Sequence, residues 1–181
     1  SKISKPRQAR GRERYLSDEE RERLLAACPA SANRYLLPVV VLAISTGMRR
    51  GEIMNLRWSD IDFLRGSILL TATKNDTSRS IPLTSLALML LQDLAKVRRL
   101  DTPLVFYGSL PNKPMDLKKP WEAAMRQAEL ENFRFHDLRH TAASYLAMNG
   151  ATTVEIAAVL GHKTLQMVKR YSHLANSHTA G

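Results

Sequence analysis

Four side chains near the C-terminal end have the types and spacing that chemistry on a phosphodiester requires. His136 and Arg139 are three residues apart, so a helix would place both on one face. His162 follows, and Tyr171 lies nine residues after it. Two imidazoles, a guanidinium and a phenol on one surface would be able to attack a phosphodiester without a metal ion.

Two further cations, Arg49 and Lys74, are predicted to join this surface. Arg49 follows a predicted helix break, and Lys74 precedes a turn signal at residues 75–76. Phosphoryl transfer adds negative charge to the non-bridging oxygens, and a guanidinium can bind those oxygens through forked hydrogen bonds. Arg49 and Arg139 are the candidates for this role. A surface ion pair with Glu52 is the alternative for Arg49, and a solubilising charge is the alternative for Lys74.

The remaining side chains can be given roles in proton transfer. The Tyr171 phenol, with an ordinary pKa of about 10, is a poor nucleophile at neutral pH unless cations or a base assist it. His136 is the candidate for that assistance, and His162 can donate an N–H bond to the phosphate. Lys74, on a hairpin, could protonate the leaving 5′-oxygen. This scheme needs no metal and no cofactor, and none is predicted.

A zinc site is the competing interpretation of this region. His136 and His140 have the HxxxH spacing, which is half of a zinc-protease signature. However, Asp137 stands where that chemistry requires a glutamate, and Arg139 on the same face would repel a dication. A metal site is therefore not predicted, and a structural histidine with its hydrogen bonds satisfied is the remaining alternative.

The composition favours an anionic polymer as partner. The chain has 181 residues, a formal net charge of +10 and 44% hydrophobic residues. This size suits one domain with its own core, and this charge suits nucleic acid or an anionic membrane. No apolar run approaches the roughly 18 residues that a spanning helix needs, so no membrane association is predicted. The single Cys28, predicted to be buried, excludes an internal disulfide and indicates a reducing, cytoplasmic compartment.

The elements that position the candidate residues are predicted to be mainly helical. A capping box at Ser17 and Glu20 begins the first helix, and another at Thr152 and Glu155 begins a later one. Apolar patterning predicts the other helices at residues 34–46, 48–56, 84–100, 121–130, 136–149 and 164–171. Residues 58–83 instead contain strand-forming residues around a turn, which predicts a small antiparallel sheet.

Residues 1–14 are predicted to be a basic arm or linker outside the domain. They contain one acid, Glu13, and six cations: Lys2, Lys5, Arg7, Arg10, Arg12 and Arg14. The segment is either a solvated tail or an arm along DNA phosphates, and its arginines are the candidate DNA contacts. The predicted domain spans residues 15–175, with a short tail at 176–181. Because the chain starts at Ser1, we expect it to be a fragment.

Five short motifs, in order along residues 12–175, resemble those of one known family. They are TGMRRGEI with Arg49 and Glu52, TKNDTSRSIPL with Lys74, HDLRH with His136 and Arg139, LGHK with His162, and RYSH with Tyr171. Each motif alone is weak, but five in the right order are specific. On these residues the chain resembles the catalytic domain of the tyrosine recombinases, the phage-integrase type in particular.

The resemblance implies a mainly α (α+β) fold, with many helices and a small three-stranded antiparallel sheet. It implies a site-specific recombinase that cuts and rejoins double-stranded DNA through a 3′-phosphotyrosine intermediate. Tyr171 would be the nucleophile and Glu52 a supporting acid. It also implies a phage or mobile-element protein that integrates DNA in the bacterial cytoplasm.

The resemblance further implies a longer protein. The family carries an upstream helical domain that clasps the other side of the DNA, and its full-length members are expected to act as homotetramers on DNA. A monomer is left open for this chain. Only ten residues follow Tyr171, so we expect cleavage of a bound site, rather than complete recombination, from this chain alone.

Two other functions compete with this one. Residues 152–171 also resemble a helix-turn-helix, which predicts a DNA-binding protein without enzymatic activity. That interpretation explains the charge but leaves Arg49, Lys74 and the HxxR pair without roles. A type IB topoisomerase would share the chemistry and would differ in assembly and choice of site.

Overall fold

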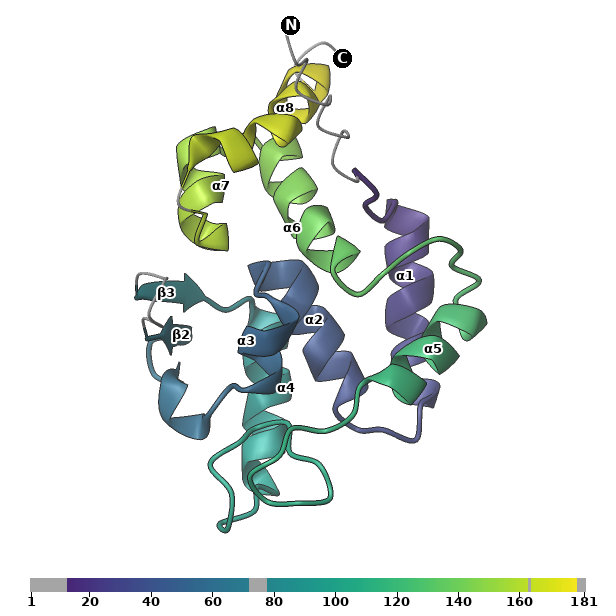
Figure 1. Ribbon diagram of the computed structural model, residues 1–181, viewed down its shortest axis with the longest axis vertical. Helices are drawn as coiled ribbons and strands as arrows, with labels where there is room; N and C mark the ends of the chain where they lie inside the picture. The colour runs from purple at the N-terminus through teal and green to yellow at the C-terminus, as the bar shows by residue number, and fades with distance from the viewer. Residues whose placement is uncertain (1–12, 72–77, 163, 179–181) are drawn as a thin grey trace, which may run out of the picture.

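The computed structural model of the chain describes residues 13–71, 78–162 and 164–178, with side chains to residue 175 (Figure 1). The helices are α1 (Asp18–Ala27), α2 (Leu36–Thr46), α3 (Arg50–Met54), α4 (Ser85–Lys96), α5 (Lys118–Gln127), α6 (Asp137–Met148), α7 (Thr153–Leu160) and α8 (Ser172–His178). The strands are β1 (Ile61–Asp62), β2 (Ser67–Leu70) and β3 (Arg79–Pro82). The predicted site residues outside the described ranges are Arg7, Arg10, Arg12 and Lys74.

α2 lies among the other helices and packs against α6, α4 and α3 (Figure 1). Its sequence is apolar almost all round, and Pro38 stands in the first turn, where its missing N–H costs no helical bond. Gly47 ends the helix in a left-handed conformation with φ of 64°. A Cβ at Gly47 would overlap the side chain of Leu160. The end of α2 is therefore held against α7, and the chain turns there into α3.

The predicted antiparallel sheet is present, with three strands in the order β1-β2-β3. Ile68 pairs with Ile61 on one side and with Ile81 on the other. All three side chains are buried, so one face of the sheet packs on the core. Residues 72–77, between β2 and β3, lie outside the described part of the chain, and Lys74 is among them.

The predicted helix at residues 164–171 is wrong. The structure has two 3₁₀ turns there, Leu165–Met167 and Lys169–Tyr171, and α8 follows them. Val168 and Tyr171 are three residues apart and are both buried in a small core with α6 and α7. That spacing suits the three residues per turn of a 3₁₀ helix. Residues 164–171 therefore do not form the second helix that a helix-turn-helix requires.

The predicted capping boxes are confirmed at Ser17 and Thr152, where α1 and α7 begin. Other boundaries differ from the prediction. α3 is shorter than residues 48–56, and α5 begins at Lys118 rather than at Trp121. Cys28 is buried, as predicted. Within the described ranges, each helix is too short or too polar to cross a bilayer.

The N-terminal end of the described chain is bound to α6. Leu16 is fully buried, and its N–H donates to Thr141 Oγ1 at 3.1 Å. Tyr145 Oη donates to the Leu16 carbonyl, also at 3.1 Å. Tyr145 thus anchors this segment to the helix that carries Arg139.

Candidate active site

Arg49 and Glu52 are positioned by the turn that follows α2. Arg49 is the last residue before α3, and Glu52 lies in the first turn of that helix. One Glu52 oxygen accepts the backbone N–H of Arg49 at 2.7 Å, and the other accepts Arg49 Nη1 at 3.2 Å. The ion pair with Glu52, which was the alternative interpretation of Arg49, is therefore present. Because 37% of the Arg49 side chain is exposed, its guanidinium remains accessible to a ligand.

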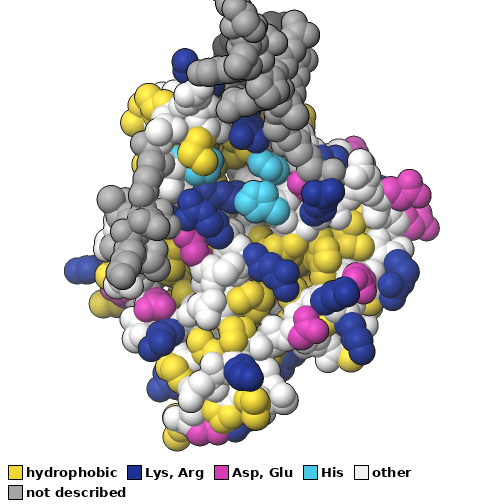
Figure 2. Space-filling view, viewed as in Figure 1, with side chains coloured by type: hydrophobic (Ala, Val, Ile, Leu, Met, Phe, Trp, Pro, Cys, Tyr) yellow, Lys and Arg dark blue, Asp and Glu magenta, His cyan; other side chains and the backbone are white. Residues whose placement is uncertain are grey.

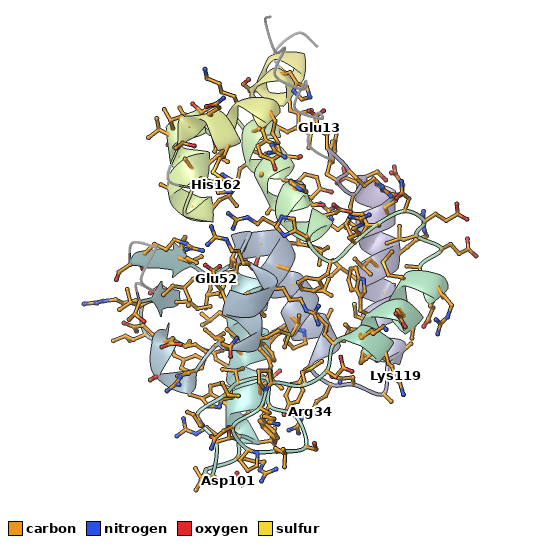
Figure 3. All side chains as sticks on the ribbon, viewed as in Figure 1. Glu13, Arg34, Glu52, Asp101, Lys119 and His162 are labelled. Atoms are coloured by element: carbon orange, nitrogen blue, oxygen red, sulfur yellow. The ribbon has the colours of Figure 1, made fainter. Side chains whose placement is uncertain are left out.

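Arg79, on β3, forms an ion pair with the same Glu52, although no motif in the sequence indicated this contact. Its Nη2 lies 2.9 Å from both carboxylate oxygens of Glu52, and only 11% of its side chain is exposed. A Cβ on Gly161 would lie 2.5 Å from Arg79 Nη1, so the backbone just before His162 rests on this guanidinium. Arg79 therefore connects β3, α3 and the loop after α7. Figure 3 labels Glu52 beside α3 and His162 near α7.

Arg139, on α6, is held by the ends of two other helices. Its Nη1 donates to the Gly47 carbonyl at 2.5 Å, and its Nη2 donates to the Leu160 carbonyl at 2.7 Å. The carbonyls at a helix C-terminus carry partial negative charge, which suits a cation. The side chain is 5% exposed, and burial, followed by the positive charge of Arg49, lowers its pKa to about 10. Arg139 is therefore still a cation at neutral pH.

His162 follows the left-handed Gly161 that ends α7. Burial, with the nearby charges of Arg139 and Arg49, lowers the pKa of His162 to about 4. The ring is therefore neutral at pH 7, with one N–H to donate. Its Nδ1 is buried and has no hydrogen-bond partner among the residues that the structure describes. A ligand oxygen is one group that would satisfy a donor at this position.

Tyr171 is buried and contacts a histidine that the sequence analysis did not place in the site. The phenol is 4% exposed, and its Oη lies 2.5 Å from Nδ1 of His140. Burial raises the pKa of Tyr171. Burial and the neighbouring His136 lower the pKa of His140 to about 4. The exposed His136, which directly precedes α6, packs edge-on against His140 with ring centroids 5.2 Å apart.

The fold brings most of the predicted site residues together. The pKa of Arg139 responds to the charges of Arg49, Glu52, Arg79 and Tyr171. Figure 2 shows histidine side chains directly beside Arg or Lys side chains on one face of the molecule. Arg14, a predicted DNA contact, instead forms a forked ion pair with Glu20 at 2.8 and 2.5 Å. Its role in DNA binding stays a prediction.

Comparison with known proteins identifies the family. The model of the family described as "Phage integrase family" matches residues 14–178, so the chain belongs to this family. It is 36% identical to the shufflon-specific DNA recombinase of Escherichia coli over 95% of this chain and 43% of that protein. It is 32% identical to the integrase of Salmonella phage P22 over 97% of this chain and 48% of that protein. The chain thus spans less than half the length of these two relatives.

Solved structures agree with this assignment. The crystal structure of XerA recombinase superimposes with a TM-score of 0.79, at 25% identity, over 92% of this chain and 62% of that one. The catalytic domain of bacteriophage HP1 integrase gives a TM-score of 0.71, at 29% identity, over 92% and 90%. The predicted family, fold class and enzyme class are confirmed: this is a catalytic domain of the tyrosine recombinase type.

Proposed function

We propose that the protein cuts and rejoins double-stranded DNA at a specific site, with Tyr171 forming a 3′-phosphotyrosine. The observation that carries this proposal is the position of the phenol. Its hydroxyl contacts His140, the residue after Arg139 on α6, and its charge acts on Arg139. The charges of Arg139 and Arg49 in turn act on His162. A phosphate placed among these side chains would have hydrogen-bond donors for its non-bridging oxygens and a nucleophile beside it.

In this proposal the side chains have distinct roles. Arg49 and Arg139 bind the two non-bridging oxygens, and their charge stabilises the trigonal-bipyramidal transition state. His162 donates a further N–H. Tyr171 Oη attacks phosphorus as the bond to the 5′-oxygen breaks, and Lys74 is proposed to protonate that oxygen. The reverse attack by a 5′-hydroxyl rejoins the strand without ATP, because the phosphotyrosine conserves the bond energy.

The burial of Tyr171 bears on how cleavage begins. With 4% of the residue exposed, the hydroxyl can meet a phosphodiester only if the surrounding surface opens. Tyr171 is carried by the 3₁₀ turn Lys169–Tyr171 rather than by the interior of a long helix. Rearrangement of this turn is proposed to expose the ring. DNA binding is the event proposed to cause it.

The names of the relatives and the charge of the chain support a proposal for the partner and the setting. One relative is named a DNA recombinase, and this chain carries a net charge of +10, which favours a polyanion. We propose a double-stranded recombination site as substrate, a homotetramer on DNA for the whole protein, and the bacterial cytoplasm as location. Within the chain, residues 1–14 are proposed as an arm, 15–175 as the catalytic domain and 176–181 as a tail.

The test is formation of a covalent protein–DNA adduct. Duplexes that the chain retains from a random pool would define its site, and a nick next to the scissile phosphate would trap the cleaved state. We expect an adduct that resists denaturation and forms in the presence of EDTA. Tyr171→Phe should bind the same duplex and form none. An adduct with the Phe variant would refute Tyr171 as nucleophile, and no adduct with either protein on its selected site would favour a non-enzymatic DNA binder.

A further inference from the structure

The proposed function leaves one side chain in contact with the nucleophile without a role. His140 lies on α6 directly after Arg139, and its Nδ1 is 2.5 Å from Tyr171 Oη. The ring planes of His140 and Tyr171 are inclined at 41°, with centroids 6.2 Å apart. This is a hydrogen bond between two side chains separated by 31 positions in the sequence. Only the tertiary fold brings them together.

The direction of this hydrogen bond follows from the charge state of each partner. The groups whose charges act on His140 are His136, Arg170, Asp137 and Arg139. With burial, they lower the pKa of His140 to about 4, so the imidazole is neutral at pH 7. Burial raises the pKa of the phenol, so the phenol keeps its proton. A neutral imidazole has one nitrogen that accepts, and the phenol is the donor. Tyr171 therefore donates its O–H to Nδ1 of His140.

We infer that His140 is a catalytic residue on the nucleophile side, which orients the Tyr171 hydroxyl and accepts its proton as the bond to phosphorus forms. This inference rests on the proposed function. The bond from Tyr171 Oη to phosphorus forms while the bond from phosphorus to the 5′-oxygen breaks. The phenolic proton passes to His140 Nδ1, and the 5′-oxygen takes a proton from the Lys74 ammonium. Rejoining returns both protons to their origins.

Two physical effects make a weakly basic imidazole sufficient. The phenolic oxygen becomes strongly acidic as it bonds to phosphorus, so its proton needs only a nearby acceptor. A DNA phosphate also brings negative charge toward a group that is surrounded by Arg139 and Arg170, and this charge favours the imidazolium. The hydrogen bond already present shows that the fold places an acceptor beside the phenol, and the inference requires this contact to be kept when DNA exposes the ring.

The experiment separates the nucleophile side of the reaction from the leaving-group side. Cleavage rates would be measured for wild type, His140→Ala, His140→Asn and Lys74→Ala on two nicked duplexes. One duplex has an ordinary scissile phosphate, and the other has sulfur in place of the bridging 5′-oxygen. A thiolate leaves without a proton, so the sulfur duplex should restore cleavage by Lys74→Ala and should not restore His140→Ala. We expect His140→Ala to cleave both duplexes about 10²-fold to 10⁴-fold more slowly, the usual contribution of a general base.

The asparagine variant and the pH profile test proton acceptance itself. Asn offers an amide oxygen near the position of Nδ1, so His140→Asn should keep DNA binding and folding but remain slow, because an amide accepts no proton at neutral pH. The rate of His140→Ala should rise about tenfold per pH unit as phenolate forms. Wild type should be flat between pH 6 and 9, because its base is already neutral there. His173→Ala, which removes an exposed histidine two residues after Tyr171, is the matched control.

Three results would overturn the inference. A cleavage rate of His140→Ala or His140→Asn equal to or above that of wild type would show that the contact only holds the phenol at rest, while Tyr171→Phe would still be inactive. Recovery of His140→Ala on the sulfur duplex would place His140 on the leaving-group side. A pH profile of His140→Ala parallel to wild type would show that no proton acceptor was lost. If wild type itself forms no adduct, the proposed function fails instead.

Discussion

At the scale of single residues, Arg139 serves the fold and the proposed chemistry at once. Its guanidinium donates hydrogen bonds to the carbonyls of Gly47 and Leu160, where α2 and α7 end. Those two helix ends are followed by Arg49 and His162, respectively. Removing the guanidinium would leave two carbonyls without this partner, at a cost of about 1–3 kcal/mol for each buried group. Stability and catalysis therefore have to be measured separately for this residue.

We predict that Arg139→Ala lowers the cleavage rate by about 10²-fold to 10³-fold, as expected for the loss of one donor to the transition state. DNA affinity should fall only modestly, because the contact strengthens as charge develops on the phosphate. Cleavage would be followed at saturating protein, and affinity by titration. Arg65→Ala removes the same charge from a side chain that is 83% exposed and serves as the control. Equal losses of binding and of rate would contradict this role.

The sequence identified the site residues that stand in recognisable motifs, and it missed the two whose roles depend on distant partners. His140 was visible only as the fourth residue after His136, a spacing that suggested a metal. Arg79 stood inside the TKNDTSRSIPL motif but was read as part of a hairpin. Nothing local relates Arg79 to Glu52, which lies 27 positions away. Contacts of this kind are set by packing, and local patterns do not encode them.

At the scale of elements, local signals were reliable where the physics is local. The capping boxes at Ser17 and Thr152 were predicted because the cap and its partner are three residues apart. Residues 164–171 were predicted as one helix, but Val168 and Tyr171 are drawn into the core with α6 and α7. Burial of these two side chains outweighs the preference for a continuous α-helix, and the segment forms 3₁₀ turns instead.

The Arg79 contact provides a prediction about how elements are held together. We expect Arg79→Leu to slow cleavage, because Glu52 and the loop before His162 lose the guanidinium that connects them. The free energy of unfolding should fall by about 1–3 kcal/mol, since Glu52 keeps its bonds to Arg49. Urea denaturation and the adduct assay would measure the two effects. The exposed Arg98→Leu is a control.

A double variant distinguishes a specific contact from general damage. If Arg79 acts through Glu52, then Arg79→Leu combined with Glu52→Leu should destabilise the protein by less than the sum of the single changes. Strict additivity would mean that the two side chains do not stabilise each other, whatever their 2.9 Å separation.

At the scale of the whole molecule, the net charge of +10 should make DNA binding steeply dependent on salt. The N-terminal segment is either a solvated tail or an arm along DNA phosphates, and these two interpretations predict different salt dependences of DNA binding. Residues 1–12 carry five cations: Lys2, Lys5, Arg7, Arg10 and Arg12. The logarithm of the DNA-binding constant falls as the logarithm of the salt concentration rises. If these cations bind phosphates, deleting residues 1–12 should make that fall less steep, by up to about 0.9 per cation. Cleavage of a saturated site should be unchanged. An unaltered slope would identify the segment as a solvated tail.

Leu16 is joined to α6 through both its N–H and its carbonyl. One of its partners, Thr141, is the next residue after His140 along that helix. Mechanical tension on the polypeptide at Leu16 would therefore be transmitted directly to α6, the helix whose His140 contacts the Tyr171 phenol. A displacement of the chain at Leu16 is therefore expected to alter the proposed cleavage step through α6.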